Sequence, residues 1–344
     1  MAELLKDHTT LRLGGPATTW VEARTEGEVV EAVGRLDADG EPALVLAGGS
    51  NVLVADEGFA GTVVKVATTG VTADSDDPDD LACLGAVTVT VAAGESWDAL
   101  VARAVEAGWV GFEALSGIPG SVGATPIQNV GAYGQEVSET IARVRVWDRV
   151  LRGFRTFAAA DCGFGYRTSR FKADPGRHVV LDVTFLLKQG TLGAPVRYAE
   201  LASTLGIEQG ERAPLADVRA AVLKLRSGKG MVLDPDDRDT WSAGSFFTNP
   251  VVAAGDVPEG APAWAQPDGR VKTSAAWLIE QAGFRKGHGS DRVSLSTKHT
   301  LALTNRGSGT TAELLELARE IRDGVETRFG IRLVNEPVLV GCTL

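Results

Sequence analysis

The sequence predicts an α+β protein with more than one domain. Its 344 residues are enough for about two or three domains. Apolar residues make up 44% of the chain and charged residues 23%, which is normal for a globular protein that buries substantial cores. Segments with the period of a strand alternate with amphipathic helices, and a long glycine-rich stretch at 117–134 interrupts them.

The first 66 residues predict a small, partly parallel sheet. Residues 17–23 and the apolar run 43–47 have strand character, and residues 28–36 between them form an amphipathic helix. A strand–helix–strand unit of this length suits a right-handed crossover. Two further strands are predicted at 52–54 and 62–66.

The middle of the chain opens on an acidic segment, residues 72–80. Its composition predicts a solvated loop rather than a cation site, and a joint between domains. Beyond it, Ser96 is placed to cap a helix that runs to residue 107. The remaining elements expected here are strands at 87–91, 141–147 and 178–187 and a helix at 213–226.

The C-terminal part begins with a polar loop at 227–240. The letters at 307–312 fit the G-x-G-x-x-A pattern of a dinucleotide site, but too few strands follow to complete such a sheet. A capping box, with Thr310 as N-cap and Glu313 three residues later, explains the same letters better. The elements expected are helices at 274–282 and 312–328 and strands at 301–304 and 331–340.

Charge and cysteine content narrow the classes of partner. The net charge of −11 argues against nucleic acid or an anionic membrane as the main partner. The three cysteines are far apart and the four histidines lack metal-ligand spacing, so we expect a reducing compartment and no metal site. The sequence shows no signal peptide and no membrane-spanning run. We therefore expect a cytoplasmic protein with no nucleic-acid partner and no membrane partner.

Two glycine-rich segments are candidate ligand sites. Stretch 117–134 mixes apolar anchors with glycines that let the backbone come close to a flat ligand. Residues 48–51, Gly-Gly-Ser-Asn, follow a strand and could form an anion-binding nest. Each has a structural alternative, a buried packing turn for the first and an ordinary tight turn for the second. The residues themselves leave both interpretations open.

Arg167 is a candidate for binding an anionic ligand. It lies in a basic segment between Tyr166 and Phe171, which would anchor the segment and aim the guanidinium. A second basic turn, around Lys229, would suit a phosphate, or it is simply the C-terminus of a helix with favourable cations.

Ser245 and Glu336 are candidates for the chemistry. Ser245 precedes two phenylalanines, so it is either an N-cap or a polar group in a dry pocket. Glu336 precedes Pro337 in an apolar segment. It is either an edge-strand charge that faces water or a carboxyl with a raised pKa in a site.

Several motifs occur as an ordered set over almost the whole chain. They are TTLRLGGPA at 9–17, GGSN at 48–51, the glycine-rich stretch 117–134, GYR at 165–167, GSFFTNP at 244–250, WLIEQ at 277–281 and NEP at 335–337. As a set they resemble the UDP-N-acetylenolpyruvoylglucosamine reductase family. The glycine-rich stretch followed by the GSFF motif is the most specific part of the match.

The resemblance implies the FAD-binding fold of the vanillyl-alcohol oxidase type, with two α+β FAD subdomains and a third α+β substrate-binding domain. Residues 1–70 would form the first FAD subdomain, with the C-terminal strand near 333–344 returning to it. Residues 71–226 would form the second, and residues 227–332 the substrate-binding domain.

The resemblance also implies an activity in peptidoglycan precursor synthesis. NADPH, as co-substrate, would reduce non-covalently bound FAD, and the sugar nucleotide UDP-N-acetylglucosamine enolpyruvate would be reduced to UDP-N-acetylmuramate. Arg167 matches the family's enolate-binding arginine, Ser245 its proton donor and Glu336 its catalytic glutamate. We expect a monomer.

The same motif match supplies the other expected site residues. Those expected to bind FAD are Gly48, Gly49, Ser50, Asn51, Gly117, Pro119, Gly120, Gly123, Ala124, Gln128 and Gly131. Those expected to bind substrate are Tyr133, Tyr166, Tyr198, Lys229, Asn249 and Gln281, with Tyr198 on the extra tyrosine-bearing loop of one class of the family.

Two alternative functions remain for comparison. One is a flavin oxidase of a small alcohol or sugar. The GSFF motif, Glu336 and the lack of a histidine motif for covalent flavin argue against it. The other is a nucleotide-binding module, which would have no redox chemistry.

Overall fold

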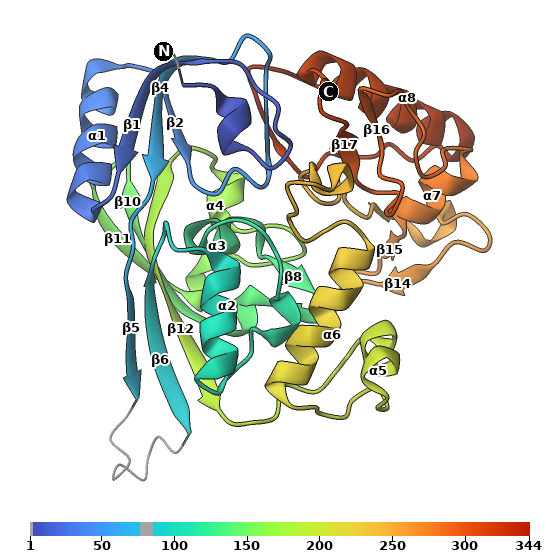
Figure 1. The fold of residues 1–344 in the computed structure, drawn as a ribbon, viewed down its shortest axis with the longest axis horizontal. Coiled ribbons are helices and arrows are strands. Elements are labelled where there is room, and N and C mark those ends of the chain that lie inside the picture. Colours follow the sequence, from blue (N-terminus) through green and yellow to red (C-terminus); the bar gives the residue numbers. More distant parts are fainter. Residues whose placement is uncertain (1–2, 76–84) are drawn as a thin grey trace. The chain divides into compact units, whose positions relative to one another are not determined.

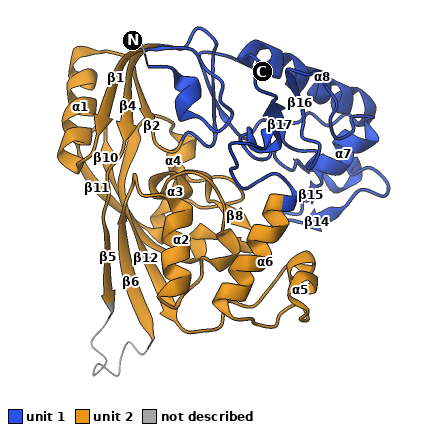
Figure 2. Ribbon diagram, in the orientation of Figure 1, with its two compact units in different colours: residues 1–17, 49–59, 228–344 blue, residues 18–48, 60–227 orange. Residues whose placement is uncertain are grey.

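The computed structural model describes residues 3–75 and 85–344, which divide into two compact units (Figure 2). Unit 1 consists of Met1–Ala17, Gly49–Phe59 and Gly228–Leu344, and unit 2 of Thr18–Gly48 and Ala60–Ser227. The chain therefore crosses between the units several times. The finer division into three domains at 70/71 and 226/227 stays a prediction.

A three-stranded sheet in unit 2 confirms the strands and the helix predicted near the N-terminus (Figure 1). Its strand order is β1-β4-β2, and β2 pairs with β4 in parallel. The crossing helix α1 begins with a capping box between Thr25 and Glu28 and ends at Gly40 in the left-handed conformation. The bounds are β1 (Ala17–Ala23), α1 (Glu26–Asp39), β2 (Ala43–Leu46) and β4 (Phe59–Val66).

A larger antiparallel sheet dominates unit 2. Its strand order is β11-β10-β12-β6-β5, and β7 pairs with one end of β12. Helix α2 covers one face (Figure 1), where Trp97, Phe112 and Phe185 form a buried aromatic cluster with edge-to-face contacts. Ser96 caps α2 as predicted. The bounds are β5 (Val71–Ser75), β6 (Ala86–Ala92), α2 (Trp97–Glu106), β7 (Trp109–Val110), β10 (Ile141–Asp148), β11 (Gly153–Ala158) and β12 (His178–Gln189).

The loop predicted at 72–80 is wrong for its first part. Residues 71–75 form strand β5, which pairs antiparallel with β6 in a register that sets Thr72 opposite Thr90. An edge strand tolerates exposed polar and acidic side chains, so acidic composition hid the strand pattern. The rest of that segment, residues 76–84, lies outside the described residues. Strand β11 was not predicted.

The described residues of unit 2 contain four other α-helices. Helix α3 lies within the glycine-rich stretch, α4 follows that stretch, and α5 and α6 follow strand β12. The predicted helix at 213–226 is confirmed as α6. It shares a small buried cluster with α5 that includes Leu201, Val218 and Val222. The bounds are α3 (Thr125–Gln128), α4 (Arg170–Ala173), α5 (Ala199–Leu205) and α6 (Leu215–Gly228).

Unit 1 holds the C-terminal helices and several short strands. Strand β18 pairs in parallel with β3, so the end of the chain returns to residues 52–54. The capping box of Thr310 and Glu313 at the start of α8 is confirmed. The bounds are β3 (Val52–Val54), β13 (Val251–Val252), β14 (Ala263–Ala265), β15 (Val271–Thr273), α7 (Ala275–Gln281), β16 (Val293–Leu295), β17 (Leu303–Asn305), α8 (Thr311–Phe329) and β18 (Val338–Val340).

The strand predicted at 331–340 is wrong over most of its length, because only residues 338–340 form a strand. Proline at 337 removes a backbone donor, and Asn335 makes an isolated bridge with Phe247 instead of joining a ladder.

Candidate cofactor and substrate site

The glycine-rich stretch of unit 2 is held from α2. The carboxylate of Asp98 accepts the backbone N–H of Gly117 at 2.6 Å, and Gly117 itself has a positive φ of 71°. The carbonyl of Gly120 accepts the N–H of Trp97 at 3.1 Å. The chain then turns through a short 3-10 helix at 122–124 into α3 and leaves it at Asn129, another residue with positive φ.

Two of the expected cofactor glycines are required by close backbone approach. A Cβ on Gly48 would lie 2.6 Å from the Cα of Gly120, and one on Gly123 would lie 2.5 Å from the Cβ of Ala93. The packing interpretation of the glycines therefore holds at these positions. Gly48 is nevertheless exposed, so this junction presents bare backbone to whatever binds there.

Ser121 is a site candidate that the sequence prediction missed. It is 4% exposed, and its hydroxyl has no hydrogen-bond partner among the described residues. A buried hydroxyl without a partner is unfavourable by about 1–3 kcal/mol, so a native structure supplies one from a ligand or water. A phosphate-bearing cofactor such as FAD, bound on the exposed backbone of Gly48 next to Gly120, could provide the hydrogen-bond partner that the Ser121 hydroxyl lacks among the described residues.

Arg167 lies against the glycine-rich stretch and not in open solvent. Its guanidinium donates to the carbonyl of Gly131 at 2.7 Å and to the carbonyl of Asn129 at 3.3 Å. The side-chain amide of Asn129 in turn donates to the carbonyl of Gly165 at 3.0 Å. The glycine-rich stretch and the segment that carries Arg167 are thus hydrogen-bonded in both directions. Arg167 has a positive φ of 52°, and the Tyr166 ring lies 5.7 Å from its guanidinium carbon. The prediction that neighbouring residues aim Arg167 is thus consistent with its contacts.

Gln128 is fixed within the same region. Its side-chain oxygen accepts a hydrogen bond from Lys172 at 2.9 Å, and Lys172 also donates to the carbonyl of Arg167 at 3.0 Å. Unit 2 therefore brings Gln128, Gly131, Tyr166 and Arg167 together.

Tyr133 sits at the tip of a two-residue hairpin at the end of the glycine-rich stretch. Strands β8 (Gly131–Ala132) and β9 (Gln135–Glu136) pair antiparallel, and both turn residues, Tyr133 and Gly134, have positive φ. Positive φ at both positions is what the tight type I′ turn requires. The ring of Tyr133 makes an edge-to-face contact with Tyr198, with centroids 5.9 Å apart. Tyr198 is 48% exposed and stands as N-cap of α5.

Arg226, near the end of α6, is a buried cation that the sequence did not single out. It is 7% exposed, and burial lowers its pKa to about 10. It remains charged at neutral pH and interacts electrostatically with Tyr133, whose own pKa is raised by burial. The segment for which the sequence leaves open a phosphate-binding turn or a helix C-terminus with favourable cations therefore contributes one cation to the interior of unit 2.

In unit 1, residues 49–51 are tightly fixed by the N-terminal segment. Gly49 has a φ of 58°, and a Cβ there would lie 1.9 Å from the carbonyl oxygen of His8. Thr10 donates its N–H to Gly49 and its hydroxyl to the Ser50 carbonyl, the latter at 3.4 Å. The tight-turn interpretation explains Gly49, and the structure leaves the anion-nest interpretation a prediction.

Ser245 and Glu336 come from adjoining backbone segments of unit 1. The N–H of Glu336 donates to the carbonyl of Phe246, the residue after Ser245, at 2.8 Å. Asn51 donates its side-chain amide to the Glu336 carbonyl at 3.4 Å. Phe246 and Phe247 are both 1% exposed and pack edge to face, with ring centroids 5.1 Å apart. Two residues distant in sequence, Ser245 and Glu336, thus lie in adjoining backbone segments.

The other expected substrate residues of unit 1 are more scattered. The side-chain oxygen of Asn249 accepts the N–H of Ala275 at 3.0 Å and so caps the start of α7. Gln281 is exposed at the other end of α7, and Lys229 follows the end of α6.

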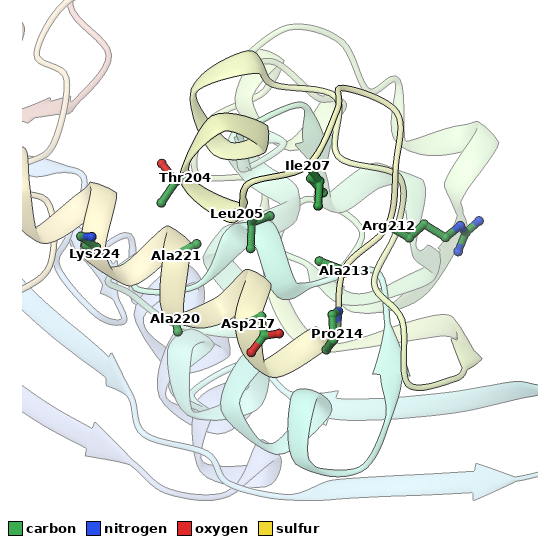
Figure 3. Close-up of a pocket in the computed structure, with 10 residues that line it drawn as sticks. All are labelled: Thr204, Leu205, Ile207, Arg212, Ala213, Pro214, Asp217, Ala220, Ala221 and Lys224. Carbon is green, nitrogen blue, oxygen red and sulfur yellow. The ribbon is translucent and has the colours of Figure 1, made fainter.

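A cavity of about 460 Å³ lies between α5 and α6 in unit 2 (Figure 3). It contains none of the expected site residues. It is lined by Thr204, Leu205, Ile207, Arg212, Ala213, Pro214, Asp217, Ala220, Ala221 and Lys224.

Residues 3–75 and 85–344 contain no helix long and apolar enough to cross a membrane. Within those same ranges, no three side chains of His, Cys, Asp or Glu gather as metal ligands would.

Comparison with known proteins defines the class first. The sequence model of the FAD binding domain matches residues 17–150, which include strands β1, β4 and β2 and the backbone around Gly48 and Gly120. Together with the fold, this match confirms the predicted α+β FAD-binding fold. The chain is an FAD-dependent oxidoreductase.

The particular family follows from the rest of the chain. The C-terminal domain of UDP-N-acetylenolpyruvoylglucosamine reductase matches residues 234–340. The reductase of Cutibacterium acnes is 60% identical over 339 residues, covering 98% of this chain and 89% of the relative. That of Thermobifida fusca is 56% identical over 353 residues, covering 99% and 97%. The chain belongs to the UDP-N-acetylenolpyruvoylglucosamine reductase family and functions in peptidoglycan precursor synthesis, as predicted.

A solved structure agrees with this assignment. The UDP-N-acetylenolpyruvylglucosamine reductase of Thermus caldophilus superposes with a TM-score of 0.66 and 27% sequence identity, covering 99% of this chain and 98% of that one.

Proposed function

We propose that this chain reduces UDP-N-acetylglucosamine enolpyruvate to UDP-N-acetylmuramate with NADPH as the electron donor. The relatives named above carry this substrate in their names. The observation that carries the proposal is the backbone junction that brings Ser245 and Glu336, a hydroxyl and a carboxyl residue, into adjoining segments of unit 1. Such a pair suits protonation of a strongly basic carbon.

The reaction adds one hydride and one proton across the enolpyruvyl double bond. The backbone around Gly48 and Gly120 would hold FAD, which would supply the hydride when bound, with NADPH as the source of electrons. Addition at the terminal carbon leaves an electron pair on the carbon next to the carboxylate, delocalised as an enolate. Fixed positive charge stabilises that enolate most strongly in a site without water.

Arg167 provides that charge. Its hydrogen bonds to the carbonyls of Gly131 and Asn129 hold the guanidinium in one position before the reaction starts. Because no side chain has to reorganise, the stabilisation is available when the enolate forms.

Ser245 donates the proton to the enolate carbon. A serine hydroxyl is a weak acid, so it serves only a very basic acceptor held in direct contact. Glu336 assists at the same intermediate, by hydrogen bonding or by returning a proton to Ser245. The product is the lactyl ether, with both added hydrogens on carbon.

The remaining assignments are part of the same proposal. Tyr133, Tyr166, Tyr198, Lys229, Asn249 and Gln281 bind the sugar nucleotide. Gly48, Gly49, Ser50, Asn51, Gly117, Pro119, Gly120, Gly123, Ala124, Gln128 and Gly131 bind FAD, and we add Ser121 because of its buried hydroxyl.

An anaerobic titration tests the proposal. The purified holoprotein should be yellow, lose its visible absorbance on addition of NADPH, and regain it on addition of the enolpyruvyl sugar nucleotide. The product should be heavier than the substrate by two hydrogens. A protein that binds FAD but regains colour only with oxygen would be an oxidase, and a colourless protein without affinity for FAD would contradict both.

A further inference from the structure

Glu113 is a buried carboxylate that the proposed reaction does not use. It is 1% exposed and begins the 3-10 helix at Glu113–Leu115. One carboxylate oxygen accepts the N–H of Gly111 at 2.8 Å. The other accepts the side-chain amide of Gln135 at 2.9 Å and the N–H of Ala194 at 2.6 Å. Three donors converge on one side chain, and the two oxygens of a carboxyl group can accept from all of them.

Two of these donors belong to the segments that carry Tyr133 and Tyr198. Gln135 is the first residue of β9, directly after the Tyr133–Gly134 turn of the hairpin. Its side-chain oxygen also accepts the N–H of Ala114 at 2.9 Å, so the amide is fixed at both ends. Ala194 lies four residues before Tyr198 on the segment that leads to α5.

The hairpin and the second segment also touch directly. The guanidinium of Arg197 donates to the carbonyl of Gly134 at 3.1 Å, and a Cβ on Gly134 would lie 2.9 Å from the Cβ of Arg197. Tyr133 itself has a φ of 48°, which a bulky residue adopts only where its surroundings impose it. Arg197 is mostly exposed, so the buried Glu113 links are the firmer constraint.

We propose that Glu113 is a positioning residue that fixes the Tyr133–Tyr198 aromatic pair in register for the sugar-nucleotide substrate. The inference rests on the proposed function only in assigning both rings to the substrate. Glu113 acts through the hairpin and the α5 segment and touches no substrate. Replacing it with glutamine sets an amide NH₂ where donors now converge, which breaks at least one of the links.

The chain offers a direct readout because it has only three tyrosines, Tyr133, Tyr166 and Tyr198. Protein labelled with 3-fluorotyrosine should give three fluorine NMR signals, each assigned by its Tyr→Phe variant. In Glu113→Gln the signals of Tyr133 and Tyr198 should shift or broaden, and that of Tyr166 should stay. The matched control is Glu106→Gln, which changes an exposed glutamate at the end of α2 and should leave all three signals unchanged.

Kinetics give the second arm. Glu113→Gln should raise the KM for the sugar nucleotide about tenfold, equivalent to about 1.4 kcal/mol. The change in kcat should be smaller, because the lost interactions bind the substrate equally in the ground state and in the transition state. FAD content should equal that of the wild type. If the wild type shows no turnover, the proposed function fails, while the fluorine signals still test the positioning role.

Two results would overturn the inference. One is unchanged Tyr133 and Tyr198 signals in Glu113→Gln. The other is an equal shift of all three signals with loss of flavin, which would mark a merely structural residue. If Glu113→Gln does not fold, Gln135→Met removes one link while keeping the side-chain size, and its spectrum is judged by the same two criteria.

Discussion

Substituting Gly48 with alanine tests whether the backbone junction with Gly120 forms part of the FAD site. The new Cβ would lie 2.6 Å from the Cα of Gly120, whereas ordinary contact begins at 3.4 Å. The two segments would therefore have to separate by at least 0.8 Å, the difference between these distances. Overpacking of this kind costs about 1–3 kcal/mol, which corresponds to an affinity loss of about 5- to 150-fold if bound FAD requires the native spacing.

The assay is a titration of apoprotein with FAD, followed by quenching of flavin fluorescence, combined with urea unfolding of the apo and holo forms. The control is Gly34→Ala within α1, where an added Cβ meets nothing within 4 Å. That variant should keep wild-type FAD affinity and gain about 0.5–1 kcal/mol of stability, because alanine replaces glycine in a helix.

The outcome separates the two interpretations of this junction. If it serves packing alone, Gly48→Ala lowers the stability of the apoprotein but leaves the dissociation constant of FAD unchanged. Unchanged affinity would refute the argument that this backbone binds the cofactor.

Three further predictions concern stability and reactivity. Hydrogen bonds from Arg177 hold the pKa of the buried Asp148 at about 2. Asp148→Asn should therefore cost about 1–2 kcal/mol in urea unfolding at pH 7, a range reduced because Arg177 is partly exposed. Since the folded pKa is depressed, that difference is complete above about pH 4 and should disappear as the pH falls towards 2; a difference that persists at pH 2 would contradict the ion-pair explanation. Burial raises the pKa of the Cys162 thiol to about 11, so peptide mapping should find it unalkylated at pH 8 in native protein and alkylated in urea. Equal labelling in both would show that the thiol is accessible. Thr310→Ala should cost about 1 kcal/mol in thermal or urea unfolding by removing the N-cap of α8, and no loss would mean that the capping box is redundant.

Local sequence patterns were sufficient to predict an element where a residue type has one well-defined structural role. Ser96 and Thr310 predicted their helix starts because a hydroxyl before an amphipathic run satisfies free N–H groups. Strand β5 was missed because it is an exposed edge strand whose residues begin a segment of acidic composition. The strand expected at 331–340 was overextended because apolar residues there pack without a ladder partner.

The site depended on contacts that no local pattern reveals. The motif resemblance supplied Arg167, Ser245 and Glu336, but the hydrogen bonds of Arg167 and Glu336 reach residues far away in sequence. In the sequence Glu113 has no feature that distinguishes it from other acidic residues. Its role is indicated only by the hydrogen bonds that Gln135 and Ala194 donate to it in the structure. Ser121 has no signal beyond its place after Gly120, since only burial shows that its hydroxyl lacks a partner among the described residues.

The central claim is that Ser245 protonates the substrate after hydride addition, and rapid-mixing absorbance of the two half-reactions in Ser245→Ala tests it most directly. Reduction by NADPH should stay near the wild-type rate. Reoxidation by the enolpyruvyl sugar nucleotide should slow by about 10²–10⁴-fold, the range for loss of a general acid. Ser308→Ala, an exposed serine in the same unit, should leave both rates unchanged. Equal slowing of both half-reactions in Ser245→Ala would contradict the claim.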